Sequence, residues 1–156
     1  HPNDKKRVIR ALEIYELTGK RKSEQHDERI PRLPVLAVGV DYPREELYAR
    51  IDARVDGMMK AGLVEEVEGL LNSGISENAQ CMQGIGYKEV AEILKNTDSH
   101  STMSDKFNAM SDMIKKNTRN YAKRQLTYLR KRNVVWLAPK PVEALVQEVC
   151  SLYEGN

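Results

Sequence analysis

The spacing of apolar positions divides the chain into helical segments and two short apolar runs. Residues 4–17 carry apolar side chains at helical spacing, and Gly19 just beyond them is expected to end that helix. The runs 33–40 and 134–137 are continuous and bounded by turn residues, which is typical of strands buried on both faces. Further helices are expected over residues 43–71, with a break or bend at Gly62, and over residues 87–95, 104–131 and 141–152.

Polar and glycine-containing stretches separate these elements. Residues 20–32 are polar and have the composition of a linker or loop, and residues 81–86 form a loop that contains two glycines. Asp41 is placed to cap the helix that begins near Pro43, because its carboxylate can accept a hydrogen bond from a free backbone N–H.

The two predicted strands are separated by a long helical stretch, and two isolated strands do not form a stable sheet alone. They are therefore expected to complete a parallel sheet whose other strands lie upstream of this chain. The first residue is not methionine, and a helix follows almost at once, which also suggests a chain cut from something longer. Together these features predict an α/β, predominantly helical fragment.

The composition, with 40% apolar and 31% charged residues, fits a globular protein rather than a disordered one. A net charge of +2 does not by itself indicate a nucleic-acid partner. Cys81 and Cys150 lie far apart, and neither they nor the three histidines have the spacing of a metal site. A reduced, cytoplasmic location is therefore expected, and a structural zinc site is not. No apolar run approaches the roughly 20 residues that cross a bilayer, so no membrane partner is expected.

Basic residues concentrate in the longest predicted helix, and no acidic residue lies between positions 115 and 132. Helical geometry gathers five cations into one sector: Lys115, Lys116, Arg119, Lys123 and Arg130. The residues on the other side are Phe107, Met110, Ile114, Tyr121, Gln125 and Tyr128. We expect that side to pack against the protein and the cations to face a phosphate backbone. The alternative is a solvated charged face, but the helix has no acids for ion pairs one turn apart, which favours nucleic acid.

One arginine falls inside an apolar stripe of the helix predicted over residues 43–71. The stripe is defined by Leu47, Ile51 and Met58. Arg54 lies within it and Arg50 borders it, whereas Asp52 and Asp56 point away. A buried guanidinium needs an anion or a full set of acceptors, so Arg54 is either a structural arginine paired within the protein or an anion-binding residue suited to phosphate.

Residues 83–88, which include Gly84 and Gly86, precede a predicted helix. The glycines either form a flexible connection or let the backbone approach a ligand near the free N–H groups of the helix. The segment is not a dinucleotide-binding fingerprint, and the chain contains no phosphate-loop motif.

Several segments, in chain order, together resemble the tRNA dimethylallyltransferase (tRNA isopentenyltransferase) family. They are residues 1–4 with 7–13, 47–58 with 62–67, 85–89, and 117–127. The resemblance implies a P-loop-kinase-like core with an inserted helical domain that helps to hold the tRNA anticodon arm. It also implies the transfer of a dimethylallyl group from its diphosphate to N6 of the adenosine 3′ of the anticodon, with Mg²⁺.

On this resemblance, residues 1–32 are the end of the helical insertion and a linker, and residues 33–156 are the C-terminal part of the core. The two short strands would belong to its parallel sheet. The phosphate loop, the ligands of Mg²⁺ and the carboxylate that accepts the N6 proton would lie upstream. We therefore expect the chain alone to be inactive, and to bind the tRNA anticodon stem-loop and dimethylallyl diphosphate as a monomer.

The resemblance also implies roles for individual residues. Arg54 matches an arginine expected to bind the substrate diphosphate and stabilise it as charge builds in the reaction. Arg50 and Arg119 are further possible substrate contacts. The segments that match tRNA-contacting parts of the family contain Lys6, Arg7, Arg10, Gln83, Gly84, Ile85, Gly86, Tyr87, Lys88, Lys123, Arg124, Gln125, Thr127 and Arg130. Gln83 and Gly84 stand where some relatives carry Arg and Cys.

Two other functions are open from the residues alone. A non-catalytic helical RNA-binding module would explain the basic helix but not an arginine in an apolar stripe. The back half of another P-loop enzyme, such as a small-molecule kinase, would leave the basic helix merely solvated.

Overall fold

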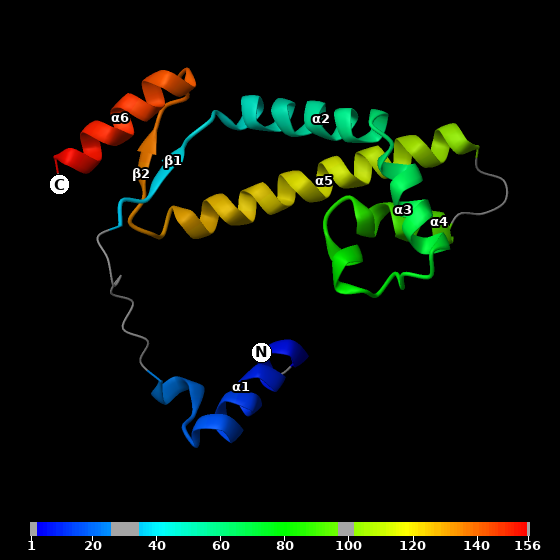
Figure 1. Ribbon diagram of the computed structural model, residues 1–156, viewed down its shortest axis with the longest axis horizontal. Helices are drawn as coiled ribbons and strands as arrows, with labels where there is room; N and C mark the ends of the chain where they lie inside the picture. Colours follow the sequence, from blue (N-terminus) through cyan, green and yellow to red (C-terminus); the bar gives the residue numbers. More distant parts are fainter. Residues whose placement is uncertain (1–2, 26–34, 97–101, 156) are drawn as a thin grey trace. The chain divides into compact units, whose positions relative to one another are not determined.

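The computed structural model describes residues 3–25, 35–96 and 102–155 (Figure 1). In chain order these residues form α1 (Lys5–Thr18), the 3₁₀ helix η1 (Lys22–Glu24), β1 (Val38–Val40), α2 (Arg44–Lys60), α3 (Leu63–Asn72), the 3₁₀ helix η2 (Gln80–Gln83), α4 (Tyr87–Asn96), α5 (Met103–Leu129), β2 (Val135–Leu137) and α6 (Val142–Glu154). Six α-helices and a two-stranded parallel sheet confirm the predicted α/β, predominantly helical fold class. Among the described residues, no helix is both long enough and apolar enough to span a membrane.

The chain divides into two compact units, His1–Val35 and Leu36–Asn156. In the first, the side chain of Asp4 caps α1 by accepting a hydrogen bond from the backbone N–H of Arg7 at 3.2 Å. Gly19 ends the helix in the left-handed region at φ 67°, as predicted, because a residue without Cβ adopts that conformation at little cost. The apolar side chains of α1 are exposed or half-buried. Most of the predicted linker, residues 26–32, lies outside the described residues.

In the second unit, β1 and β2 pair with each other in parallel. Gly39 lies opposite Trp136, and a Cβ on Gly39 would come within 2.8 Å of the Trp136 ring, so only glycine fits without a shift. The regular strand covers Val38–Val40, a shorter segment than the apolar run that predicted it. The helices between the strands therefore bring the chain back to the sheet, where β2 lies directly beside β1.

The helix after β1 begins at Arg44 with Pro43 at the N-cap position, so the prediction that Asp41 caps it is wrong. The carboxylate of Asp41 instead accepts hydrogen bonds from Arg130 at 3.2 and 3.4 Å, since the helix starts too far along the chain for Asp41 to reach its free N–H groups. The predicted break at Gly62 is confirmed: its φ of 95° ends α2 and turns the chain into α3.

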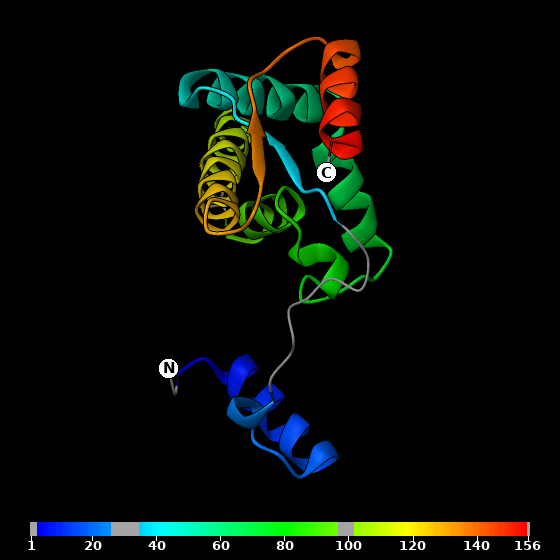
Figure 2. The same ribbon diagram turned by 90° about the vertical axis from the view of Figure 1, so that its left-hand side faces the viewer.

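The core of this unit lies where α2, α3, η2, α4 and α5 meet. Its buried residues are Val55, Met59, Leu63, Val64, Val67, Met82, Val90, Ala91, Met110 and Ile114. The loop predicted over residues 81–86 contains a 3₁₀ turn that directs Met82 fully into this core. Figures 1 and 2 show α3 and α4 at one end of the α2–α5 pair, and the two strands with α6 at the other.

Candidate functional site

Helix α5 is tied to α2 and to the loop before it by three ion pairs. They are Arg130–Asp41 at 3.2 Å, Arg119–Asp52 at 3.0 Å and Lys115–Asp56 at 2.6 Å. The position of the acid in the chain rises as that of its cation falls, so the two helices run antiparallel (Figure 1). These three ion pairs, called the ion-pair ladder below, align the two long helices along their shared length.

The ladder changes the interpretation of the basic helix. Lys115 and Arg119 were predicted to face RNA, but their side chains are only 19% and 34% exposed and point to carboxylates of α2. Asp52 and Asp56 in turn face α5 rather than away from it. The predicted packing side also differs, because Tyr121 is 45% exposed. The prediction of one basic solvent face and one packed face is therefore wrong for this part of α5.

The Lys115–Asp56 pair shifts the pKa of the Asp56 carboxyl. The hydrogen bond from Lys115 lowers the pKa of the Asp56 carboxyl, and partial desolvation opposes that effect. The nearby charges of Lys115 and Lys60 lower the pKa further. Lys115 is thus committed to holding the protein together and not to an external anion.

A groove of about 710 Å³ runs between α2 and α5 and contains Arg54. Its walls are formed by Leu47, Ile51, Arg54, Val55, Met58, Ile85, Ile114, Thr118, Tyr121, Ala122, Arg124 and Gln125. The charged side chains among them are Arg54 and Arg124, whereas seven of the twelve are aliphatic. An open groove with apolar walls and two guanidinium groups suits a small molecule with an apolar body and an anionic head.

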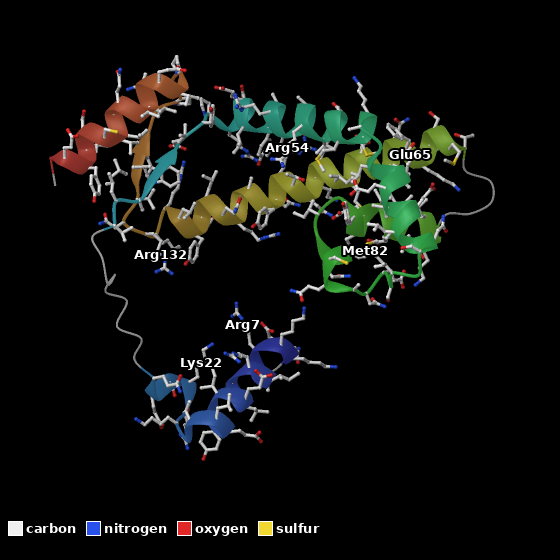
Figure 3. All side chains as sticks on the ribbon, in the orientation of Figure 1. Arg7, Lys22, Arg54, Glu65, Met82 and Arg132 are labelled. Carbon is white, nitrogen blue, oxygen red and sulfur yellow. The ribbon has the colours of Figure 1, made fainter. Side chains whose placement is uncertain are left out.

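Arg54 is exposed and extends from α2 on the side of α5 (Figure 3). Leu47, Ile51 and Met58 flank it in the groove wall, as the predicted stripe indicated. Within the part of the chain that the structure describes, Arg54 has no recorded hydrogen bond or ion pair, unlike Arg119 and Arg130. The expectation that Arg54 is buried is wrong, because its side chain reaches water; among the described residues it also has no carboxylate partner, so the structural alternative does not apply there.

A second groove, of about 300 Å³, lies between the start of α2 and the end of α5. Its lining residues are Tyr42, Arg44, Leu47, Tyr48, Lys123, Leu126, Thr127 and Arg130. Arg44 lies over the Tyr48 ring at 5.1 Å from its centroid, and Arg50 lies over Tyr42 at 4.7 Å. Three residues predicted to bind tRNA, Lys123, Thr127 and Arg130, meet here. Arg50 and Arg119 were predicted as possible substrate contacts, but neither lines the Arg54 groove. Their guanidinium groups stack instead on Tyr42 and Tyr48.

Sequence reasoning missed the aromatic wall of this groove. The signal was present in the alternation of tyrosine and arginine at residues 42–50, where half-buried rings and exposed guanidinium groups stack on each other and offer flat surfaces for bases. Along α5, Lys123, Arg124 and Thr127 also line a shallow depression of about 480 Å³ with exposed Tyr128.

The glycine-containing segment 83–88 is not a loose connection. Gly86 has a φ of 105° and donates its backbone N–H to the buried carboxylate of Glu89 at 2.7 Å. The hydroxyl of Tyr87 donates to the Glu66 carboxylate of α3, and this hydrogen bond raises the pKa of Tyr87. Gln83, Gly84, Ile85 and Lys88 are exposed, whereas Gly86 is buried and Tyr87 half-buried. The exposed side chains of this segment therefore project into solvent from a backbone that these hydrogen bonds hold in place.

In the first unit, the cations of α1 that were predicted to contact tRNA are exposed. Arg7 pairs with Asp4 at 3.2 Å and Arg10 with Glu13 at 3.0 Å, both within one helical turn. Such exposed pairs hold their charges weakly, so both arginines can exchange partners readily.

No group of three or more His, Cys, Asp or Glu side chains that could hold a metal ion occurs among the described residues. The family resemblance places the ligands of Mg²⁺ upstream of this chain.

Comparison with known proteins gives consistent matches. A family model described as IPP transferase matches residues 1–132. A tRNA dimethylallyltransferase from Syntrophomonas wolfei is 42% identical over 159 residues, covering 99% of this chain and 49% of that relative. One from Geobacter sulfurreducens is 45% identical over 134 residues, covering 84% and 41%. The crystal structure of a tRNA delta(2)-isopentenylpyrophosphate transferase from Staphylococcus epidermidis has a TM-score of 0.69 and 38% identity, covering 99% of this chain and 50% of that one. The chain spans about half the length of the curated relatives that it matches.

Proposed function

Because this chain belongs to the IPP transferase family, as its match to the family over residues 1–132 establishes, we propose that it takes part in tRNA modification by prenyl transfer. The proposed reaction moves a dimethylallyl group from its diphosphate to N6 of the adenosine 3′ of the anticodon. This chain contributes a diphosphate-binding arginine and RNA-binding surface, and acts in the cytoplasm as a monomer. Residues 1–32 end an inserted helical domain, and residues 33–156 form the C-terminal part of a P-loop-type core.

The groove that contains Arg54 is the observation that carries this proposal. Dimethylallyl diphosphate has a five-carbon apolar tail and a highly charged head, and the groove offers aliphatic walls together with Arg54 and Arg124. Its volume of about 710 Å³ is ample for a molecule of that size. A guanidinium without an internal carboxylate partner remains free to bind two phosphate oxygens at once.

The chemistry gives Arg54 a defined role. The N6 nitrogen attacks the allylic carbon, the carbon–oxygen bond to the diphosphate breaks, and the leaving diphosphate takes up the bonding electrons. Negative charge therefore grows on the diphosphate, where Arg54 stabilises it more strongly in the transition state than in the bound substrate. The proton released from N6 passes to a base that the family resemblance places upstream of this chain.

The RNA-binding surface combines the exposed cations of α5 with the turn before α4. Lys123, Arg124, Gln125 and Thr127 lie on the last turns of α5 and Arg130 directly follows it; all five line the grooves described above. The exposed residues of segment 83–88 extend this surface, since Ile85 shares the Arg54 groove. The cations of α1 add phosphate contacts from the first unit. The target base is drawn out of its stack to reach the allylic carbon.

The test joins this chain to the upstream half of the Syntrophomonas wolfei relative and measures transfer of label from dimethylallyl diphosphate to unmodified tRNA. The joined protein is expected to be active and the chain alone inactive. In the joined protein, Arg54→Ala removes charged hydrogen bonds of about 1.5–3 kcal/mol, so kcat/KM for the diphosphate should fall roughly 10- to 150-fold.

Arg132→Ala is the matched control, because Arg132 is exposed on the same unit and stacks on Tyr128 outside the groove. It should leave kcat/KM for the diphosphate within about twofold of the unmodified protein. Label in RNA from the unaltered joined protein, with equal activity of the Arg54→Ala and Arg132→Ala variants, would refute the role of the groove. Absence of label in RNA would refute the transferase function itself.

A further inference from the structure

A buried carboxylate lies directly behind the turn that carries part of the proposed RNA-binding surface. Glu89 is 4% exposed and belongs to the third position of α4. Its Oε2 accepts the backbone N–H of Gly86 at 2.7 Å, and its Oε1 accepts the side-chain amide of Asn117 on α5 at 2.7 Å. Each carboxylate oxygen therefore has one neutral donor, and the two donors come from different elements.

We propose that Glu89 is a positioning residue for RNA binding: it fixes segment 83–88 to α5 through Gly86 and Asn117. This inference rests on the proposed tRNA-binding function. Glu89 is buried and does not itself touch RNA; it holds in place the segment 83–88 whose exposed side chains do.

The energetics of burial support this role. A carboxylate is costly to bury, and Glu89 is as inaccessible to water as the neighbouring core residues Val90 and Ala91. A residue needed only for packing would be aliphatic here. Glu89 reaches back to the N–H of the residue that precedes α4, which is the return half of a capping box. That bond restrains Gly86 at a φ of 105°, where the backbone would otherwise be free.

The second bond adds what a helix cap alone would not provide. Asn117 precedes Thr118, which lines the Arg54 groove, and Ile85 of the turn lines the same groove. Glu89 therefore fixes the position of segment 83–88 relative to α5 beside this groove. As a result, the distances between exposed Gln83 and Lys88 and the cations farther along α5 stay constant.

The test exploits the different hydrogen-bonding capacities of carboxylates and amides. In Asn117→Asp, a second carboxylate faces Glu89 in a part-buried site. Two carboxylates can share one proton and keep a hydrogen bond, so binding is measured at a pH of about 9, where both are ionised, repel each other and break the link. In Glu89→Gln, the new amide accepts from Gly86 through its oxygen and donates to the Asn117 oxygen after that side chain rotates, so the link survives. In the double variant, the glutamine amide donates to the carboxylate introduced at position 117, and the link is restored.

The chain and its variants are compared for binding of an anticodon stem-loop RNA by fluorescence anisotropy, at a temperature where each is folded by circular dichroism. Loss of the link should weaken binding roughly tenfold in Asn117→Asp. Glu89→Gln and the double variant should bind within about threefold of the unmodified chain. Exchange of the Gly86 amide with solvent, followed by NMR, should be faster in Asn117→Asp than in the other two.

Val67→Ala is the stability control, because Val67 is fully buried in the core on α3. If Glu89 acted only on stability, Val67→Ala would weaken RNA binding as much as Asn117→Asp at an equal loss of Tm; we expect it to bind RNA normally. Normal RNA binding by folded Asn117→Asp, or no recovery in the double variant, overturns the inference. Failure of the unmodified chain to bind the RNA overturns the proposed RNA-binding function and, with it, the inference.

Discussion

Lys115 and Lys123 lie on the same helix, yet the structure gives them different tasks. Lys115 is 19% exposed and paired with Asp56 at 2.6 Å, whereas Lys123 is exposed and lines two surface grooves. Changing either lysine to methionine removes one positive charge and keeps most of the aliphatic stem. We expect Lys123→Met to remove a phosphate contact and Lys115→Met to leave RNA contacts unchanged.

The magnitude follows from counterion release. Each phosphate neutralised by a lysine contributes about 0.7 (single strand) to 0.9 (duplex) to the slope of log binding constant against log salt. Over a fourfold change in salt, from about 50 to 200 mM, one contact amounts to roughly a threefold change in affinity. The slope for Lys123→Met should therefore be shallower by about 0.7–0.9, while that for Lys115→Met should match the unmodified chain within about 0.2.

The assay is fluorescence anisotropy with a labelled anticodon stem-loop at several salt concentrations, and circular dichroism confirms that both variants are folded. Asp56 remains half exposed to water in Lys115→Met, so the fold should tolerate the loss of its partner. Equal changes of slope for the two variants, or a larger change for Lys115→Met, would show that the ladder does not withdraw Lys115 from RNA binding.

Two further predictions concern the sheet and the ladder. Gly39→Ala should destabilise the chain by about 1–3 kcal/mol and alter the fluorescence of Trp136, its single tryptophan, because the new Cβ would lie 2.8 Å from the ring. Gly57→Ala, on open helix surface, is the control, and equal Tm values for the two would contradict the packing argument. By NMR titration, Asp56 should have a pKa below its ordinary value of 3.8, and Lys115→Met should raise it. Because the pKa of Asp56 is lower in the folded than in the unfolded protein, the stabilisation by Lys115 should be complete well above pH 3.8 and disappear as the pH falls through the pKa of the folded protein. Identical pKa values of Asp56 in the unmodified and Lys115→Met proteins would refute the pairing.

Side-chain contacts join the segments of the second unit that resemble one family, although these segments lie far apart in the sequence. Arg119 of segment 117–127 pairs with Asp52 of segment 47–58. Glu89 of segment 85–89 bonds to Asn117, and its neighbour Tyr87 bonds to Glu66. These contacts join α2, α3, α4 and α5 of the second unit into one connected network.

Local features of the fold followed from the sequence alone. The end of α1 at Gly19 and the break at Gly62 were predicted because a left-handed turn requires glycine whatever surrounds it. Helical spacing located the helices. These predictions are confirmed because their physical causes act over a few residues. The role of Arg54, indicated by its place in an apolar stripe and by the family resemblance, stays a prediction.

The tertiary structure decided which faces meet. Periodicity identifies residues that share a side of a helix, but it does not say which neighbour that side will contact. The acids that pair with Lys115 and Arg119 come from α2, so the pattern within α5 alone predicted that those cations face a phosphate backbone. Glu89 was missed for the same reason, although its place three residues after Gly86 is a capping signal. The sequence by itself thus determined the helices and their glycine ends, because these depend on neighbouring residues; only packing decided which charges of α5 pair within the protein and which stay exposed.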